Sequence, residues 1–193
     1  MAKFLIVYSS TDGHTRVICQ RLEEIIEQQN HQVTLLSLND QPDVDLKPFD
    51  KIVLGASIRY GRHSRQVYKF IARNLRVLEE KASAFFSVNV VARKPGKNRP
   101  ETNPYVRKFL RQIPWKPKKV AVFAGKIDYP KYCFRDRQII RLIMWMSKGP
   151  TDPNAVVEFT DWRQVDDFAR LVSSMQRDTV QSLDSSTSDK SGQ

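Results

Sequence analysis

At 193 residues, with 40% hydrophobic and 10% aromatic side chains, the chain can bury one core, which excludes a fully disordered protein and predicts a single domain with a short tail. Its two cysteines, Cys19 and Cys133, lie far apart and exclude a disulfide framework and a zinc site, and no apolar run approaches the roughly 18 residues of a spanning helix. The formal net charge of +11 favours an anionic partner without choosing among nucleic acid, anionic lipid and a polyanionic small molecule.

The first part of the chain alternates between predicted strands and helices. Residues 4–8 form a continuous apolar run, typical of a strand buried on both faces of a parallel sheet, and helical spacing then extends from Thr15 to Ile26. Further strands are predicted at 33–36, 51–55, 82–88 and 119–125, with helices at 64–78 and 103–112. This order predicts an α/β fold of the flavodoxin-like type: a doubly wound, five-stranded parallel sheet with helices on both faces.

The last third of the chain departs from that alternation. Residues 126–154 are predicted to be an insert after the fifth strand, residues 156–160 resume a strand, and residues 161–175 form the last helix. After residue 177 almost no apolar side chain occurs, so residues 178–193 are predicted to be a disordered polar tail. The predicted domain therefore spans residues 1–177.

A hydroxyl-rich turn follows the first predicted strand and leads into a helix N-terminus, where exposed N–H groups and the helix dipole favour a phosphate. The chain has neither a nucleotide P-loop nor a dinucleotide fingerprint, so a monophosphate ligand fits better. An ordinary polar turn with Thr15 capping the helix is the alternative. The residues predicted to bind the cofactor phosphate are Ser10, Thr11, Asp12, Gly13, His14 and Thr15.

Two more loops leave the carboxyl ends of the third and fourth predicted strands, where open α/β sheets place their ligands. The first holds Tyr60 between two glycines, so a ring stacked on Tyr60 would lie beside the phosphate turn. The second offers backbone groups and an Asn side chain for a polar ring edge. The residues predicted to contact the cofactor ring are Ser57, Ile58, Arg59, Tyr60 and Gly61 in the first loop and Ser87, Val88, Asn89, Val90 and Val91 in the second.

These motifs resemble known ones. The turn at 10–15 resembles the FMN-phosphate loop of flavodoxins, with Asp12 where flavodoxins usually place Thr. The segments at 55–61, 87–95, 107–110 and 159–162 resemble the flavodoxin-like, quinone-dependent protoporphyrinogen oxidases of bacteria, and the match spans nearly the whole chain except the tail. The resemblance implies FMN-dependent oxidation of protoporphyrinogen IX to protoporphyrin IX in haem biosynthesis, with menaquinone or ubiquinone as the electron acceptor.

A basic surface suits a substrate that carries two propionates. Arg59 and Arg93 are predicted to hold them, with Arg62 flanking the same pocket, although an arginine in a loop is more often a solvated charge. The loop at 87–93 has no aromatic residue, so one flavin face is predicted to stay open to a large planar substrate. The three histidines are scattered, so no catalytic acid or base is predicted, and no metal is expected.

The insert contains an apolar, aromatic and cationic segment at 132–148, which suits an anionic membrane surface. Packing of its apolar side on the sheet is the alternative. The quinone acceptor favours the membrane interpretation and places the chain peripherally on the cytoplasmic side of the inner membrane. The residues predicted to contact the membrane are Phe134, Ile139, Ile140, Ile143 and Trp145. Whether the chain forms a homo-oligomer stays open.

Three other functions remain in competition. A flavodoxin-type electron carrier shares the fold, but such carriers are typically acidic and lack a basic apolar insert. An NAD(P)H-dependent quinone reductase would use the same open flavin face. A nucleic-acid-binding module would explain the net charge, but no recognition motif is evident, so no nucleic-acid partner is expected. A phosphoryl-receiver domain is excluded, because Leu54 and Gly55 stand where its acceptor Asp would be.

Overall fold

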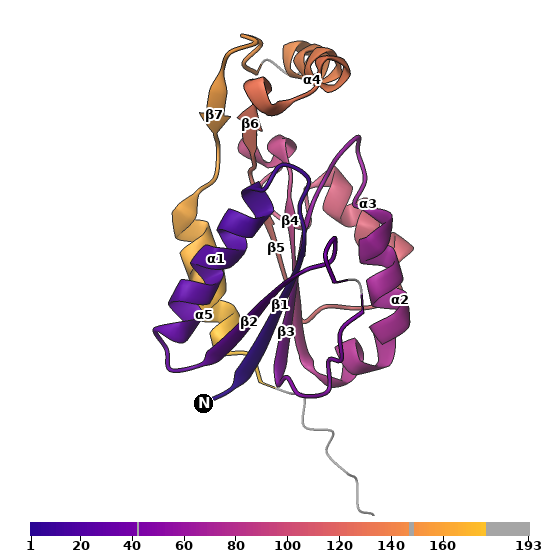
Figure 1. The fold of residues 1–193 in the computed structure, drawn as a ribbon, viewed down its shortest axis with the longest axis vertical. Helices are drawn as coiled ribbons and strands as arrows, with labels where there is room; N and C mark the ends of the chain where they lie inside the picture. Colours follow the sequence, from indigo (N-terminus) through magenta and orange to yellow (C-terminus); the bar gives the residue numbers. More distant parts are fainter. Residues whose placement is uncertain (42, 147–148, 177–193) are drawn as a thin grey trace, which may run out of the picture.

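The structure is a computed structural model that describes residues 1–41, 43–146 and 149–176, so the predicted disordered tail lies outside the described residues. A five-stranded parallel sheet forms its centre, in the order β2-β1-β3-β4-β5 (Figure 1). The strands are β1 (Lys3–Ser9), β2 (Gln32–Ser37), β3 (Lys51–Ser57), β4 (Ala82–Val88) and β5 (Lys119–Phe123). The predicted fold class is therefore confirmed, with the fifth strand ending two residues earlier than expected.

The inner strands of the sheet are apolar because both of their faces are covered. Every residue of β4 is buried, and so are residues 4–9 of β1. Gly55 on β3 is required by its neighbour, because a Cβ atom there would lie 2.2 Å from the Phe86 ring of β4. The tight fit of these strands gives a rigid edge from which the loops of the site extend.

Two helices cover each face of the sheet (Figure 1). Helices α1 (His14–Glu27) and α5 (Trp162–Ser173) pack on one face, and α2 (Arg65–Glu80) and α3 (Pro104–Gln112) pack on the other. Alternate residues of β1 point to opposite faces, so Phe4, Ile6 and Tyr8 belong to one core cluster while Leu5 and Val7 belong to the other.

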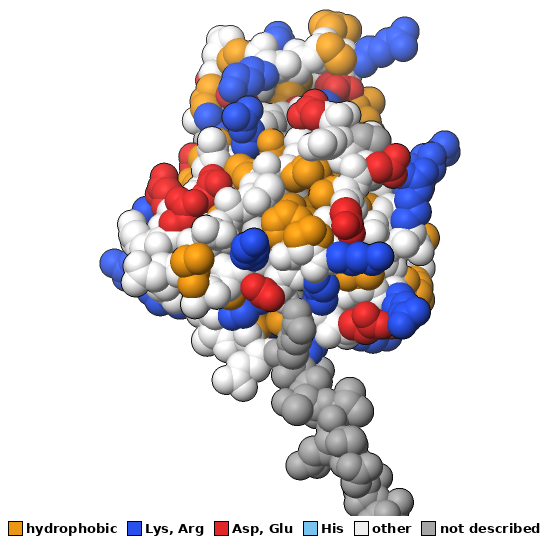
Figure 2. All heavy atoms as spheres, turned by 60° about the horizontal axis from the view of Figure 1, so that its bottom comes forward, with side chains coloured by type: hydrophobic (Ala, Val, Ile, Leu, Met, Phe, Trp, Pro, Cys, Tyr) orange, Lys and Arg blue, Asp and Glu red, His pale blue; other side chains and the backbone are white. Residues whose placement is uncertain are grey.

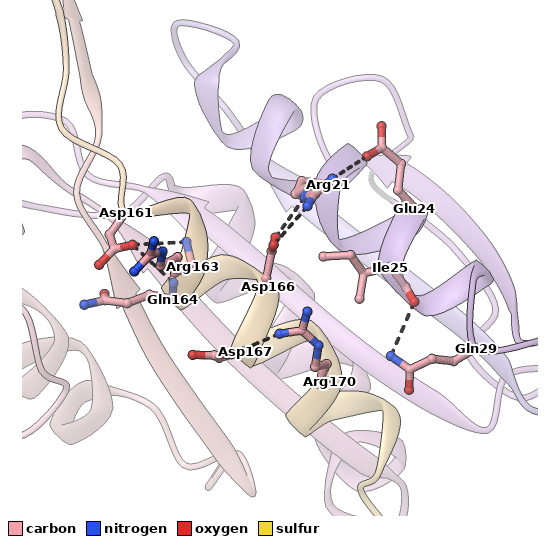
Figure 3. Close-up of polar contacts among 10 residues, drawn as sticks. All are labelled: Arg21, Glu24, Ile25, Gln29, Asp161, Arg163, Gln164, Asp166, Asp167 and Arg170. Atoms are coloured by element: carbon pink, nitrogen blue, oxygen red, sulfur yellow. Dashed lines mark hydrogen bonds and ion pairs between the residues drawn. The ribbon is translucent and has the colours of Figure 1, made fainter.

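A polar contact joins the first and last helices (Figure 3). Arg21 of α1 donates two hydrogen bonds to Asp166 of α5, with Nε to Oδ1 at 2.8 Å and Nη2 to Oδ2 at 2.9 Å. At the start of α5, the Asp161 carboxylate accepts from the backbone N–H groups of Arg163 and Gln164 and caps the helix. The bidentate pair fixes the orientation of α5 on α1.

The insert was expected to end at residue 154, but it extends through a paired strand to residue 158, and it stands above the carboxyl ends of the main strands (Figure 1). Its parts are β6 (Lys126–Asp128), the short 3-10 turn η2 (Tyr129–Lys131), α4 (Phe134–Met146) and β7 (Val156–Glu158). The expected strand at 156–160 exists as the shorter β7, but β7 pairs antiparallel with β6 in a separate two-stranded sheet and does not rejoin the main sheet. β-propensity indicates a strand but not its pairing partner, and here the partner is the outgoing strand of the same insert.

Basic and acidic side chains lie interspersed on the face turned forward in Figure 2. That arrangement spreads the net positive charge instead of gathering it there into one basic patch. Among the residues described, no helix is long and apolar enough to cross a membrane, and no cluster of His, Cys, Asp or Glu could hold a metal ion.

Candidate functional site

The main cavity lies at the carboxyl edge of the sheet, beneath the insert, and has a volume of about 500 Å³, within the usual range for small-molecule sites. The three loops predicted from the sequence meet there. From these loops the lining includes Ser10, Asp12, His14, Thr15, Ser57, Ile58, Arg59, Tyr60, Gly61, Val88, Asn89, Val90 and Val91. The other predicted cofactor residues, Thr11, Gly13 and Ser87, do not line it.

The turn before α1 fits a phosphate. Gly13 precedes the helix with a φ of 85°, and no side chain caps the helix, so the alternative in which Thr15 caps it is wrong. Thr15 is only 1% exposed, and its hydroxyl is the one buried side-chain donor or acceptor without a hydrogen-bond partner in the described parts of the chain. An unpaired buried hydroxyl costs about 1–3 kcal/mol, a cost that a bound anion would remove.

The Tyr60 loop is a tight turn with an exposed ring. Backbone hydrogen bonds join Arg59 and Arg62 in both directions, at 3.0 and 3.2 Å. Between them Tyr60 and Gly61 adopt left-handed φ values of 49° and 76°. Left-handed φ values at a residue other than glycine store strain and are common at ligand sites. The turn leaves the Tyr60 side chain 54% exposed at the cavity, where a planar ring can stack on it.

Arg59 connects the phosphate turn to the insert. Its Nη1 donates to Asp12 Oδ1 at 2.8 Å, and its Nη2 donates to Asp136 on α4. The Tyr60 hydroxyl donates to the same Asp136 carboxylate, and the hydrogen bond from Tyr60, followed by the Arg59 charge, lowers the Asp136 pKa. Two carboxylates therefore already balance the guanidinium that was predicted to meet a substrate propionate.

The third loop uses its Asn side chain for its own structure. Asn89 is 4% exposed, and its Oδ1 accepts from the Ala92 backbone and from Asn103 Nδ2, each at 3.1 Å. These bonds hold the 3-10 turn η1 (Val90–Arg93) in place. A ring edge at this loop would therefore meet backbone groups of residues 88–91, and not the Asn amide oxygen that the sequence suggested.

The insert closes the cavity with residues that the sequence did not assign to it: Lys126, Ile127, Tyr132 and Met144. Gly125, which precedes the insert, and Tyr105 of α3 add to the wall. Two predicted membrane contacts, Ile140 and Ile143, also line the cavity. The other three, Phe134, Ile139 and Trp145, are 74%, 43% and 70% exposed. The apolar side chains of α4 thus divide between the cavity and the outer surface.

His14 and His63 occupy different environments. His14 Nε2 lies 2.6 Å from the Thr160 hydroxyl, which itself donates to the Ala124 carbonyl, so His14 acts as the donor. Burial lowers the His14 pKa, although Glu158 opposes this. His63 is 2% exposed against Phe109, and burial lowers its pKa to about 3.

Arg93 lies away from the main cavity's lining. Its Nη1 donates to the Val90 carbonyl at 3.1 Å, and the guanidinium lies 5.7 Å from the centre of the Phe159 ring. The structure therefore brings Arg59 to the cavity and places Arg93 at the end of the η1 turn, outside the cavity lining.

Comparison with known proteins identifies the family. The family model described as a flavodoxin domain matches residues 5–154. The protoporphyrinogen IX dehydrogenase (quinone) of Escherichia coli K12 is 42% identical over 170 residues, which cover 88% of this chain and 94% of that protein. The chain belongs to the flavodoxin-like protoporphyrinogen IX dehydrogenase family. The dehydrogenase of the same name from Leishmania major is 40% identical over 168 residues, covering 86% of this chain and 73% of that protein.

The fold of this dehydrogenase family member is also found in solved flavodoxins. Oxidised flavodoxin 1 from Bacillus cereus superposes with a TM-score of 0.53 at 14% identity, covering 89% of this chain and 97% of that one. FMN fits the site on three counts: the uncapped helix start, the unpaired Thr15 hydroxyl and the exposed Tyr60 ring. The predicted cofactor therefore agrees with the chemistry of the residues present.

Proposed function

We propose that the chain oxidises protoporphyrinogen IX to protoporphyrin IX on FMN and passes the electrons to a respiratory quinone. The observation that carries this proposal is a preformed cavity for FMN in a chain that matches 94% of the E. coli dehydrogenase at 42% identity. FMN supplies a two-electron acceptor when bound. The residues of the chain bind and orient the cofactor and the substrate, and they exclude water.

The proposed cofactor contacts follow the loops. The turn at 10–15 and the Thr15 hydroxyl hold the phosphate, since no side chain caps the start of α1 and the buried Thr15 hydroxyl has no protein partner. Tyr60 stacks on one side of the ring, and the backbone at 88–91 meets its edge. Buried apolar side chains of the insert, Tyr132 and Met144, keep water from the ring.

Arg59 and Arg93 remain proposals as propionate ligands. Support for Arg59 is that its Nη2 already holds a carboxylate, Asp136, which a propionate would replace. Arg93 requires the substrate to reach past the η1 turn, since its guanidinium lies against Val90 and Phe159. No acid–base group is assigned, because the His14 proton is engaged by Thr160.

The outer side of α4 supports a proposal about location. Phe134, Leu142, Trp145 and Met146 are 74%, 56%, 70% and 70% exposed, on a helix that also carries three arginines. Exposed apolar groups beside cations bind anionic lipid surfaces. We infer that α4 contacts the cytoplasmic membrane surface, where the quinone would be reached.

Vesicle binding tests this location. We expect Phe134→Ser with Trp145→Ser to abolish co-sedimentation with anionic phospholipid vesicles. The control, Val17→Ser with Leu171→Ser, removes exposed apolar side chains from α1 and α5, where they are 46% and 41% exposed, and should leave co-sedimentation intact. Equal behaviour of the two variants would contradict the proposal.

The function is tested by spectroscopy of the purified protein. Flavin absorption bands are expected, and anaerobic addition of protoporphyrinogen IX should bleach them. Porphyrin fluorescence should then appear at a rate that depends on the added quinone. Turnover with NAD(P)H and quinone but not with the porphyrinogen would instead assign a quinone reductase, and reversible reduction without either turnover would assign an electron carrier.

A further inference from the structure

A second cavity of about 500 Å³ lies beside the first, between the Tyr60 loop, the start of α2 and the length of α3. The two cavities share Ile58, Gly61 and Tyr105 in their linings. A Cβ atom at Gly61 would lie 3.6 Å from the Tyr105 ring, so these two residues face each other in the shared wall. A single ligand can therefore reach from the main cavity into the second one.

The second cavity differs from the first in its charge. Its lining holds three cations, Arg62, Arg65 and Lys108, and no carboxylate. Within residues 1–41, 43–146 and 149–176, none of the three side chains forms an ion pair or a hydrogen bond. By contrast, Arg21 and Arg59 each form an ion pair with a carboxylate.

The position of Arg65 opposes local stability. Arg65 is the first residue of α2, and neither α2 nor α3 carries an acidic residue in its first turn. The helix dipole disfavours a cation at that end of a helix. Among the other polar lining groups, Tyr68 and Gln112 are joined to each other at 3.2 Å, and His63 Nε2 lies 3.1 Å from the Ser87 hydroxyl, so none of these three neutralises the cations. The cavity therefore presents unmatched positive charge to whatever enters it.

We propose that the second cavity binds the propionate carboxylates of the tetrapyrrole substrate, which assigns them to Arg62, Arg65 and Lys108 in preference to Arg59 and Arg93. The inference rests on the proposed function, because it assumes that the macrocycle lies in the main cavity against the flavin. Both propionates project from one edge of the macrocycle, and guanidinium and ammonium groups bind carboxylates through charge-assisted hydrogen bonds. This arrangement places the charged edge beyond the Gly61–Tyr105 wall and the oxidisable ring beside the cofactor.

The test measures equilibrium binding of protoporphyrin IX to the FMN-loaded protein by fluorescence quenching. In Arg62→Gln/Arg65→Gln/Lys108→Gln, we expect the Kd to rise at least about tenfold, because charge-assisted bonds are lost. The control, Lys69→Gln/Arg107→Gln/Arg111→Gln, removes the same charge from the same two helices outside both linings, and its Kd should change less than about twofold. Bound FMN and the thermal midpoint report that each variant is folded.

The neutral dimethyl ester of protoporphyrin IX provides a test without any substitution. The ester should bind the wild type as weakly as the free acid binds the cavity variant. Equal affinities of free acid and ester for the wild type would overturn the inference, as would equal losses in the cavity and control variants. A cavity variant that raises the KM for NADPH but leaves the porphyrin Kd unchanged would assign the cations to a phosphate and would also overturn it.

Turnover separates this inference from the proposed function. Quinone-dependent oxidation of protoporphyrinogen IX should show a raised KM in the cavity variant with kcat within about twofold, because the carboxylates lie away from the reacting carbons. A wild type that binds porphyrin through these cations yet oxidises no porphyrinogen would refute the function and keep the binding site. A wild type that oxidises porphyrinogen with unchanged KM in the cavity variant would refute the binding site alone.

Discussion

Apolar side chains are buried in the sheet and its four helices, whereas many of them are exposed in the insert at 126–158. In the sheet, β4 is buried at every position, and core clusters fill the space on both faces. In the insert, the buried cluster is reduced to Ile127, Tyr129, Tyr132 and Met144, while α4 leaves several large apolar side chains exposed. The sheet therefore contributes most of the free energy of unfolding, and the insert presents exposed apolar surface that another molecule can contact.

The comparison shows where the site lies relative to these two regions. The phosphate turn and the Tyr60 loop extend from the rigid sheet, so their geometry is set before a ligand binds. The insert reaches them through Asp136, which binds both Arg59 and Tyr60. The cavity thus has a fixed floor and a cover held by a few polar contacts.

The largest expected effect is in the sheet. Phe86→Ala should lower the free energy of unfolding by about 3–5 kcal/mol, because it empties a space bounded by Gly55, Phe123 and Phe168. Trp145→Ala, at an exposed position of α4, should change it by less than about 0.5 kcal/mol. Urea denaturation measures both, and similar losses would show that the insert shares the main core.

A pH dependence of stability is also expected from the sheet region, where His63 is buried. His63 has a pKa of about 3 when folded and regains its ordinary value of 6.5 when unfolded, so the unfolded state binds the extra proton. The stabilisation is complete above pH 6.5 and falls as the pH drops towards 3, by roughly 3 kcal/mol at pH 4. Urea titrations at several pH values should show a shallower loss for His63→Leu than for His31→Gln, because partly exposed His31 is less desolvated than buried His63.

A smaller effect is expected at the boundary between the two regions. Thr15→Val keeps the shape of the side chain and removes its unpaired hydroxyl. FMN should bind at least about tenfold more weakly, since a hydrogen bond to a charged group is worth about 1.5–3 kcal/mol, while the apoprotein should lose no stability. Flavin fluorescence titration of the apoprotein measures the first quantity, with Thr11→Val as the control. A destabilised apoprotein with normal FMN affinity would contradict this assignment.

The smallest expected change in global stability is in the cover. Asp136→Asn weakens the contacts to Arg59 and Tyr60, so α4 should open more often and trypsin should cut it several-fold faster. Urea midpoints should stay at the wild-type value. Asp167→Asn, which removes an exposed pair with Arg170 on α5, is the matched control. Unchanged proteolysis would mean that other contacts hold the insert.

The succession of strands and helices along the chain and the polar turn before α1 were predictable, because continuous apolar runs and a polar turn before a helix are local signals. The cover was not, since α4 carries apolar residues on more than one side and its spacing does not indicate which side meets the cavity. The burial of His63 also escaped prediction, because it depends on the distant partners Ser87 and Phe109. The cations of the second cavity come from one loop and two helices, so only the folded chain shows that they converge.

The chain leaves the main fold at Gly125 and returns to it at Phe159, and this junction affects how the sequence between them can vary. The backbone N–H of Phe159 bonds the Gly125 carbonyl at 3.1 Å, so the outgoing and returning chains lie one hydrogen bond apart. A different segment between Gly125 and Phe159 would leave the register of the five parallel strands unchanged, because all five strands precede it. Residues 126–158 therefore behave as an exchangeable cassette, through which evolution or an engineer can redefine what the cofactor meets while inheriting the same fold.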